Sequence, residues 1–349
     1  MEAEEIRTQE RSRGRSLISP QTTLAIGLII GLFALGVCFC WSLAQGAKHI
    51  PLETVYEAMT SSDGSTEQII VRTVRLPRSL MAIAVGAALA VAGAIMQGLT
   101  NNPLADPGIL GLESGAALAV VLAAFIYGNP SFTAYAGFAF VGAGITAIAV
   151  YGVSSLGKGG VTPLNLTVAG AACSALLSSM TTAILLLSQR TLEDIRFWLA
   201  GSLSGRDIAL FNQVLPYIVV GLVIALVLGK QITILNLGED IAQGLGQPIW
   251  WVKITAAVSV VLLAGSAVAI AGPVGFVGLV VPHVVRMAIG FDYAWILPYS
   301  AIIGAILLLS TDIVSRILIP PQELPVGIVS ALIGAPFFVY LTRKQVKHG

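Results

Sequence analysis

The chain has 349 residues, of which 56% are hydrophobic and 11% are charged, and its formal net charge is only +1. A soluble domain carries about 25% charged residues, so this composition excludes a protein whose main solvent is water. Most apolar residues fall in uninterrupted runs of about 20 residues, the length that a helix needs to cross a bilayer. These runs show no alternation, which favours a bundle of helices over a β-barrel.

We predict an all-α membrane protein with about ten transmembrane helices. The predicted spans are residues 23–43, 79–99, 109–127, 132–153, 164–187, 214–228, 254–271, 274–290, 295–315 and 326–341. Four basic residues closely precede the first span and place the N-terminus in the cytoplasm, and ten spans return the C-terminus there. One transmembrane domain then occupies residues 23–344, between an N-terminal tail at 1–22 and a C-terminal tail at 345–349. Because each half holds five spans, an odd number, any internal repeat would be inverted.

Residues 74–117 form the stretch around which we expect the rest of the chain to be organised. An uncharged run at 79–99 follows a basic collar and is closed by a polar Asn-Asn-Pro turn at 101–103. A second apolar run begins at Pro107. The collar consists of Arg72, Arg75 and Arg78. The pattern therefore predicts arginines at one membrane face and a tight turn at the other.

Two polar connections outside the cytoplasm are each predicted to hold a short helix. Residues 45–78 are predicted as a loop with a short helix at 51–60. In the connection at 188–213, the apolar piece 197–203 is too short to span a bilayer. We therefore predict an interfacial or re-entrant helix there.

The predicted topology places eleven of the nineteen lysines and arginines inside and eight outside, and seven of those eight are arginines. The planar fork of arginine suits bidentate pairing with a carboxylate. The outside arginines are therefore either a docking collar for an acidic partner or locally paired residues. The local acids are Glu67, Glu193, Asp194, Asp207 and Glu323. We expect local pairing for Arg190, Arg196 and Arg206, whereas charge alone leaves both possibilities open for Arg75 and Arg78.

The polar inside segment at 233–248 carries the signals of a short helix. Asn236 is a candidate N-cap with Glu239 three residues later, Gly246 suits the left-handed C′ position, and Pro248 follows as a stop. A cytoplasmic helix of about two turns is predicted, which is either a plain connector or a knob in a groove of a soluble partner. The chain contains no GxxxxGK[ST] motif, so ATP hydrolysis would belong to another subunit.

Candidate polar groups at membrane depth are few. The fifth span carries Ser174, Ser178, Ser179, Thr181 and Thr182 among small residues. Small residues on membrane helices usually permit close helix packing, and some of these hydroxyls are candidates to line a weakly polar passage. Glu113 and Asp312 are the best candidates for intramembrane acids, and both lie near span ends. The dispersed histidines predict no metal site or catalytic site; we expect His283, beside Pro282 in an interrupted eighth span, to be packed and hydrogen-bonded.

Five motifs, in order along the chain, resemble one transporter family. They are RLPR at 75–78, GAALAVAGAIMQGLTNNPLADPGILG at 86–111, LGEDIAQGLG at 237–246, GPVGFVGLVVPHVVR at 272–286 and ELPVGIVSALIGAPFF at 323–338. Together they resemble the FecCD-type permeases, the membrane subunits of type II ABC importers for iron–siderophores, haem and cobalamin. The resemblance covers residues 23–344, so only the tails lie outside it.

The resemblance implies the type II importer fold, in a multi-pass protein of the bacterial cytoplasmic membrane. It implies a second permease copy or sister chain, two cytoplasmic ATPase subunits that hold ATP and Mg, and an extracytoplasmic substrate-binding protein. It implies no cofactor, nucleic acid or metal bound by this chain.

The resemblance also assigns roles to residues. Binding-protein docking falls on Arg75, Arg78 and Arg316. ATPase coupling falls on the segment 235–250, at Leu237, Gly238, Glu239, Ala242, Leu245 and Gly246. The pathway falls on the fifth and tenth spans, at Ser174, Ser178, Thr181 and Thr182. An ion-coupled secondary transporter remains the alternative, since such carriers also use broken helices and inverted repeats.

Overall fold

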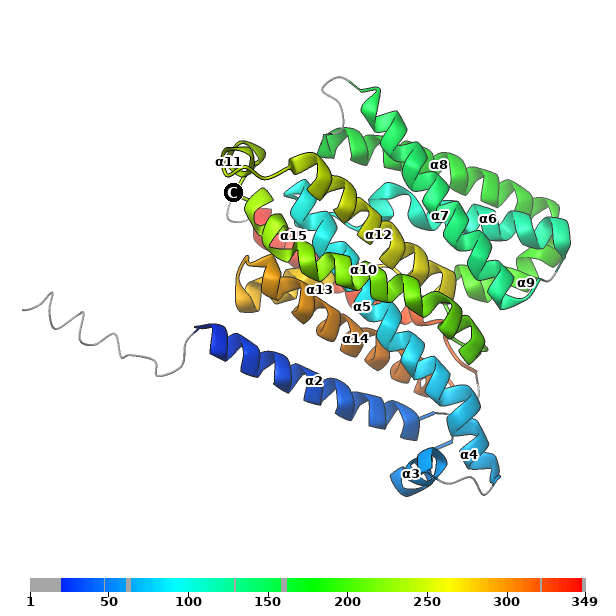
Figure 1. The fold of residues 1–349 in the computed structure, drawn as a ribbon. Helices are drawn as coiled ribbons and strands as arrows, with labels where there is room; N and C mark the ends of the chain where they lie inside the picture. Colours follow the sequence, from blue (N-terminus) through cyan, green and yellow to red (C-terminus); the bar gives the residue numbers. More distant parts are fainter. Residues whose placement is uncertain are drawn as a thin grey trace, which may run out of the picture.

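The computed structural model describes residues 20–46, 48–60, 64–128, 130–157, 162–320 and 322–346. Most of the N-terminal tail predicted at 1–22 and the last residues, 347–349, lie outside them. Every regular element in the described residues is a helix (Figure 1). These are α2 (Pro20–Ala44), α3 (Leu52–Thr60), α4 (Thr66–Ile70), η1 (Val71–Arg75), α5 (Leu76–Thr100), η2 (Pro107–Leu110), α6 (Leu112–Tyr127), α7 (Phe132–Ser155), α8 (Pro163–Leu187), α9 (Gln189–Leu199), α10 (Ile208–Leu235), α11 (Glu239–Gly244), α12 (Ile249–Ala271), α13 (Val277–Ile289), α14 (Tyr293–Ile317) and α15 (Val326–Val346).

The helices long and apolar enough to cross a membrane number seven in the described residues, and three shorter apolar helices accompany them. Each of the ten corresponds to one predicted span, with α6, α13 and α15 as the short members. The short helix predicted at 51–60 is confirmed as α3. In Figure 1, α11 lies at one end of the bundle, and α3 and α4 lie at the other. We call these the α11 end and the α4 end.

Helix α5 is the centre of the bundle, as the sequence predicted. Of the most apolar 18 residues in the helix that contains α5, 89% are buried inside the protein. In α2 the corresponding share is 0%. Helices α14, α12, α13 and α10 all pack against α5. The remaining helices reach it mainly through these neighbours, so α5 fixes the position of both ends.

Small residues allow the helices around α5 to approach closely. A Cβ atom on Gly93 of α5 would lie 2.0 Å from the carbonyl oxygen of Gly278 in α13. At the crossing with α14, a Cβ atom on Gly86 would lie 2.3 Å from the carbonyl oxygen of Gly304. Lipid tails are as apolar as the helix surfaces, so the hydrophobic effect does not drive membrane helices together. Close van der Waals packing between small residues does so instead.

The helix that carries the basic collar begins earlier than predicted. The sequence placed residues 45–78 in a loop, but α4, η1 and α5 form one continuous helix from Thr66. Ser65 caps it by accepting a hydrogen bond from the backbone N–H of Gln68. Within it, η1 is a π-helical turn in which the N–H of Leu76 bonds to the carbonyl of Val71. This wider turn falls directly before Pro77, which has no N–H for an ordinary helical bond.

The eighth span is not interrupted where the sequence indicated. Helix α13 runs through Pro282, and the break lies before it, at 272–276 between α12 and α13. Because Pro282 has no N–H, the carbonyl of Gly278 four residues earlier loses its helical partner. The side chain of Gln97 supplies one, since its Nε2 donates to that carbonyl at 3.1 Å. A polar residue of α5 thus permits proline inside a buried helix.

Two connections complete the path of the chain. The predicted turn after α5 is confirmed: Asn101 adopts the left-handed conformation, with φ at 49°. The short helix predicted at 197–203 instead spans Gln189–Leu199 as α9. Ser188 caps its start by accepting from the N–H of Thr191, and its buried face is an amphipathic stripe rather than a continuous apolar run.

The Gly93–Gly278 contact yields a prediction about stability. The variant Gly93→Ala should lose about 1–3 kcal/mol, the usual cost of overpacking a core, because the added methyl group meets backbone rather than a flexible side chain. The thermal unfolding midpoint in mild detergent measures the effect. Gly137→Ala is the control, because a Cβ atom there meets no heavy atom within 4 Å. Equal midpoints for the two variants would contradict the packing.

Candidate docking, coupling and pathway surfaces

At the α4 end, the last turns of α2 and α14 meet the start of α5. This meeting brings together the three arginines assigned to docking, although Arg316 is more than two hundred residues from the other two along the chain. We call the group the arginine cluster. Its members are Arg75, Arg78, Asp312, Arg316 and Glu323.

Asp312 is the centre of the arginine cluster. Its side chain is fully buried and accepts from both neighbouring guanidinium groups. Arg78 Nε donates to Oδ1 at 2.8 Å, and Arg316 Nε donates to Oδ2 at 3.0 Å. One carboxylate thereby joins α5 to α14. The sequence flagged Asp312 only as a candidate intramembrane acid, although its spacing of four residues from Arg316 is the spacing of a helical ion pair.

The remaining contacts of the arginines extend the cluster to α2. Arg316 Nη2 donates to Ser42 Oγ at 2.7 Å, and Ser42 is hydrogen-bonded to Ser79 of α5 at 2.7 Å. Arg75 Nη1 donates to the backbone carbonyls of Leu43 at 2.8 Å and Ala44 at 2.7 Å. These carbonyls belong to the end of α2, where intrahelical partners run out. The arginines therefore satisfy the carbonyls at the end of α2 and tie that end to α5 and α14.

The docking arginines are covered in this structure. Relative exposure is 5% for Arg75, 5% for Arg78 and 3% for Arg316. The cluster holds three guanidinium groups but only two carboxylates, which pair with Arg78 and Arg316, so it carries one positive charge in excess. Within the described residues, the guanidinium of Arg75 is bound by backbone carbonyls alone. The geometry thus gives these residues a structural role, and docking stays a prediction.

Local pairing was expected for Arg190, Arg196 and Arg206, but none of them takes part in an ion pair within the described residues. The guanidinium of Arg206 lies 4.2 Å from the centroid of the Phe132 ring instead. Its Nε has no hydrogen-bond partner within the described residues, and burial lowers its pKa to about 10. Arg196 similarly lies over a ring, that of Phe197. Glu323, counted among the local acids, is bound to Arg78.

At the opposite end, α11 forms the short helix that the sequence predicted. Its N-cap is Gly238, with φ at 118°, rather than Asn236, which ends α10. Gly246 does adopt the left-handed conformation, with φ at 78°. Gly246 N–H bonds to the carbonyl of Gln243 at 2.9 Å, and Gln247 N–H bonds to that of Ala242 at 3.0 Å. These two bonds form a Schellman motif, which stops the helix sharply.

The α11 segment exposes a group of large apolar side chains. We call it the α11 patch, and its members, each more than half exposed, are Leu237, Ile241, Leu245, Trp250 and Trp251. Of the predicted coupling residues, Ala242 is fully buried and anchors the helix, while Glu239 accepts a salt bridge from Lys253 at 2.6 Å. The coupling residues assigned from the sequence did not include Ile241, Trp250 or Trp251, although apolar residues recur every four positions at 237, 241 and 245.

The predicted pathway helices leave a large face unburied. Only Ala169, Gly170 and Thr181 are buried in α8. Ser178 and Thr182 are exposed and stand four residues apart, so they share a face of small and weakly polar residues. Thr181 points into the protein and is bonded to the carbonyl of Leu177. Ser174 is half-buried beside Gly111.

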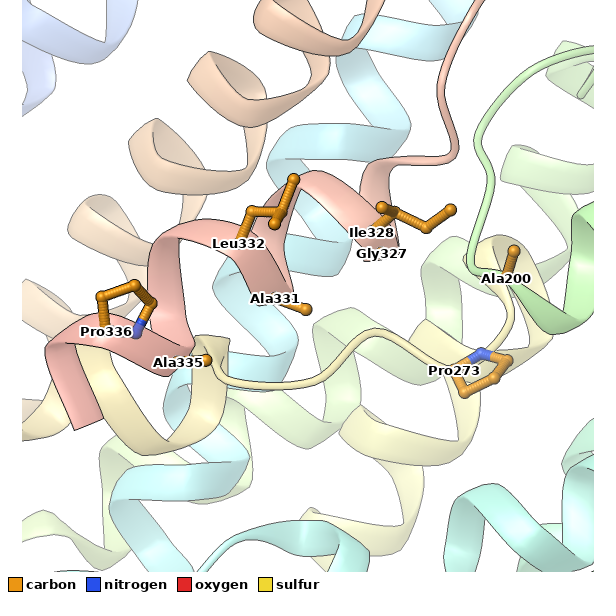
Figure 2. A pocket seen from close by; sticks show the side chains of 8 residues that line it. All are labelled: Ala200, Pro273, Gly327, Ile328, Ala331, Leu332, Ala335 and Pro336. Carbon is orange, nitrogen blue, oxygen red and sulfur yellow. The ribbon is translucent and has the colours of Figure 1, made fainter. Parts of the chain in front are cut away.

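An apolar cavity of about 530 Å³ adjoins the start of α15. Figure 2 shows it between α15, Pro273 of the α12–α13 connection and Ala200 after α9. The wall is held by backbone contact, because Gly327 N–H donates to the carbonyl of Gly201 at 2.9 Å. A cavity that is open, apolar and at a helix break suits weak contact with a bulky solute.

The sequence profile of the FecCD transport family matches residues 34–344. The chain belongs to this family. It is 47% identical, over 92% of its length and 97% of the relative's, to the Bacillus subtilis protein named "Probable siderophore transport system permease protein YfiZ". It is 39% identical, over 95% of its length and 99% of the relative's, to the ferric enterobactin transport system permease protein FepD of Escherichia coli.

A solved structure gives the same fold. The FecCD chain superposes with a TM-score of 0.80 and 30% identity on a chain described as an inward-facing conformation of a metal-chelate type ABC transporter. The match covers 91% of this chain and 98% of that one. The predicted type II ABC importer permease fold is thereby confirmed, in a multi-pass membrane protein.

The arginine cluster of this FecCD chain yields a second prediction. Asp312→Asn should lower stability by about 3–5 kcal/mol, because it leaves two buried guanidinium groups without their shared charge. The thermal midpoint and the yield of monodisperse protein report the loss. Glu67→Gln is the control: it breaks the exposed pair with Lys48, which is worth less than about 1 kcal/mol. A midpoint for Asp312→Asn close to that of the control would rule out the shared carboxylate.

Proposed function

We propose that this chain is the permease subunit of an ATP-binding-cassette importer in the bacterial cytoplasmic membrane. Its cargo is a ferric siderophore or a related metal chelate, such as haem or cobalamin, which it passes into the cytoplasm. The observation that carries the proposal is the α11 patch, an exposed apolar surface at one end of a FecCD bundle. The names of the relatives, a siderophore permease and a ferric enterobactin permease, support the choice of cargo.

The α11 patch fits a groove in a soluble ATPase. Ile241 of α11 and the flanking residues Leu237 and Leu245 form an exposed apolar surface between α10 and α12, and the two tryptophans extend it. Helices that bind in grooves use such anchors at intervals of three or four residues. Two ATPase subunits, which bind ATP and Mg, would take up this surface on a pair of permeases. This chain itself then needs no cofactor and no catalytic group.

The arginine cluster fits an acidic extracytoplasmic binding protein. Its one excess positive charge is complemented by a carboxylate of the partner, and arginine is suited to bidentate recognition of carboxylates. Arg75, Arg78 and Arg316 are the docking residues in this proposal. Their burial means that docking requires local rearrangement at the α4 end.

A second permease copy, identical or a sister chain, covers the exposed face of α8 and the cavity beside α15. Ser178 and Thr182 then line a pathway between the two subunits, with little charge to hold the cargo. Such a surface is suited to release, because transport needs binding that is weak enough to reverse.

Co-purification from the native membrane tests the proposal. The chain is tagged at its C-terminus, extracted in mild detergent and assayed for an associated ATPase that vanadate inhibits. We expect such an ATPase and an extracytoplasmic binding protein to co-purify, with a complex mass that distinguishes two identical permeases from a sister pair. If the chain is recovered alone, and uptake into vesicles follows an ion gradient instead of ATP, the secondary-carrier alternative replaces the importer.

A single charge on the α11 patch should separate the permease from its ATPase. Leu245→Asp places a carboxylate where an apolar anchor meets the partner, so we expect the co-purified ATPase activity to fall at least about tenfold, equivalent to 1.4 kcal/mol. The control is Gln243→Asp, which adds the same charge at an exposed polar position of the same helix. Equal recovery of the ATPase with both variants would refute the α11 patch as the docking surface.

A further inference from the structure

Glu323 is the accessible member of the arginine cluster. Its side chain is 32% exposed, whereas those of Arg78 and Arg316 are 6% and 3% exposed. Glu323 lies in the connection between α14 and α15, which emerges at the α4 end. An acidic partner that approaches this end therefore meets a carboxylate of like charge, and the guanidinium groups lie behind it.

Each nitrogen of the Arg78 guanidinium already has an acceptor nearby. Nε donates to Asp312, Nη1 donates to Glu323, and Nη2 lies 3.5 Å from Ser315 Oγ. Because the side chain of Arg78 is only 6% exposed, a further carboxylate reaches its fork by replacing one of these acceptors. Asp312 is not replaceable, because it is fully buried and also holds Arg316. Glu323, in an irregular connection and in contact with solvent, is the acceptor that can leave.

We propose that Glu323 is an internal counter-ion that a carboxylate of the binding protein displaces from Arg78 during docking. The inference rests on the proposed function, because it requires docking at the arginine cluster. The exchange conserves the ion pair of Arg78: the carboxylate in it now belongs to the partner, and Glu323 keeps its charge and returns to water. Arg78 is therefore paired with a carboxylate both before docking and after it.

The displaced residue also joins the two connections that flank the cavity. Glu323 Oε2 accepts from Ser204 Oγ at 3.2 Å, and Ser204 belongs to the connection between α9 and α10. Three residues after Glu323, α15 begins, and its Gly327 contacts the same connection at Gly201. Loss of Glu323 from this position therefore loosens the α14–α15 connection against the α9–α10 connection. The exchange links docking to the wall of the pathway.

The test measures the affinity of the binding protein for the permease–ATPase complex in lipid nanodiscs. The probe is the binding protein recovered by co-purification, expressed by itself. Glu323→Gln keeps the shape of the side chain and removes the competing charge, so we expect binding to become about fivefold tighter, the scale of one partly exposed ion pair. Glu67→Gln, which removes a negative charge from the exposed pair with Lys48 at the same end, is the control for long-range attraction and should change affinity less than about twofold.

A structural role alone predicts the opposite sign. If Glu323 merely braces the α14–α15 connection, Glu323→Gln leaves affinity unchanged or weakens it, and the exchange is overturned. A gain equal to that of Glu67→Gln also overturns it, since general electrostatics then explains the result. Size-exclusion elution and retained ATPase confirm that each variant is assembled.

Arg78 variants separate failure of the exchange from failure of docking. We expect Arg78→Gln to weaken binding about tenfold or more, because the partner carboxylate loses its fork. If that variant does not assemble, Arg78→Lys keeps the charge but cannot bridge two carboxylates, and the same direction is expected. If Arg78 variants weaken binding and Glu323→Gln does not tighten it, docking stands and the exchange falls. If variants of neither residue change binding, both the exchange and docking through Arg78 are refuted.

Discussion

A single buried carboxylate holds the α4 end of this membrane protein together. Asp312 accepts from Arg78 of α5 and from Arg316 of its own helix, and Arg316 reaches the end of α2 through Ser42. Charges are costly to bury, and a pair is retained only when its geometry and additional hydrogen bonds offset the loss of water. Here the arginines also donate hydrogen bonds to Ser42 and to the carbonyls at the end of α2, which have no helical donor. The requirements of the arginines and of the helix termini are therefore met by the same contacts.

The same reasoning explains the centre of the bundle. In lipid, each backbone polar group must find a partner inside the protein. Pro77 of α5 and Pro282 of α13 each lack the N–H that would bond to the carbonyl four residues earlier. The side chain of Gln97 supplies the partner that Pro282 removes, and a π-helical turn precedes Pro77. Glycines then let α13 and α14 approach α5 at backbone distance. A tightly packed centre results, to which both functional ends are attached.

In the proposed importer, the tightly packed centre around α5 holds the two ends in place, and less buried helices surround it. The α11 patch lies at one end and the arginine cluster at the other, and both are anchored by helices that pack on α5. Helix α8, by contrast, buries only three of its residues, and α15 borders an open cavity. Two-state motion needs elements with alternative contacts. Glu323, which bridges the arginine cluster and the connection before α15, occupies the place where docking and the pathway meet.

The sequence by itself determined the membrane fold, the ten apolar helices, the central position of α5 and the short helix after α10. These features depend on run length, capping residues and glycine or proline positions, which act over a few residues. Only the tertiary structure decided that Asp312 joins Arg78 to Arg316, that Glu323 covers Arg78, and that Arg206 lies over Phe132 instead of a carboxylate. It also placed Ala242 inside and Ile241 outside, and moved Arg75 from a predicted loop into a helix. Ion pairs and burial depend on which distant helix ends meet in space, and no local pattern along one chain specifies that meeting.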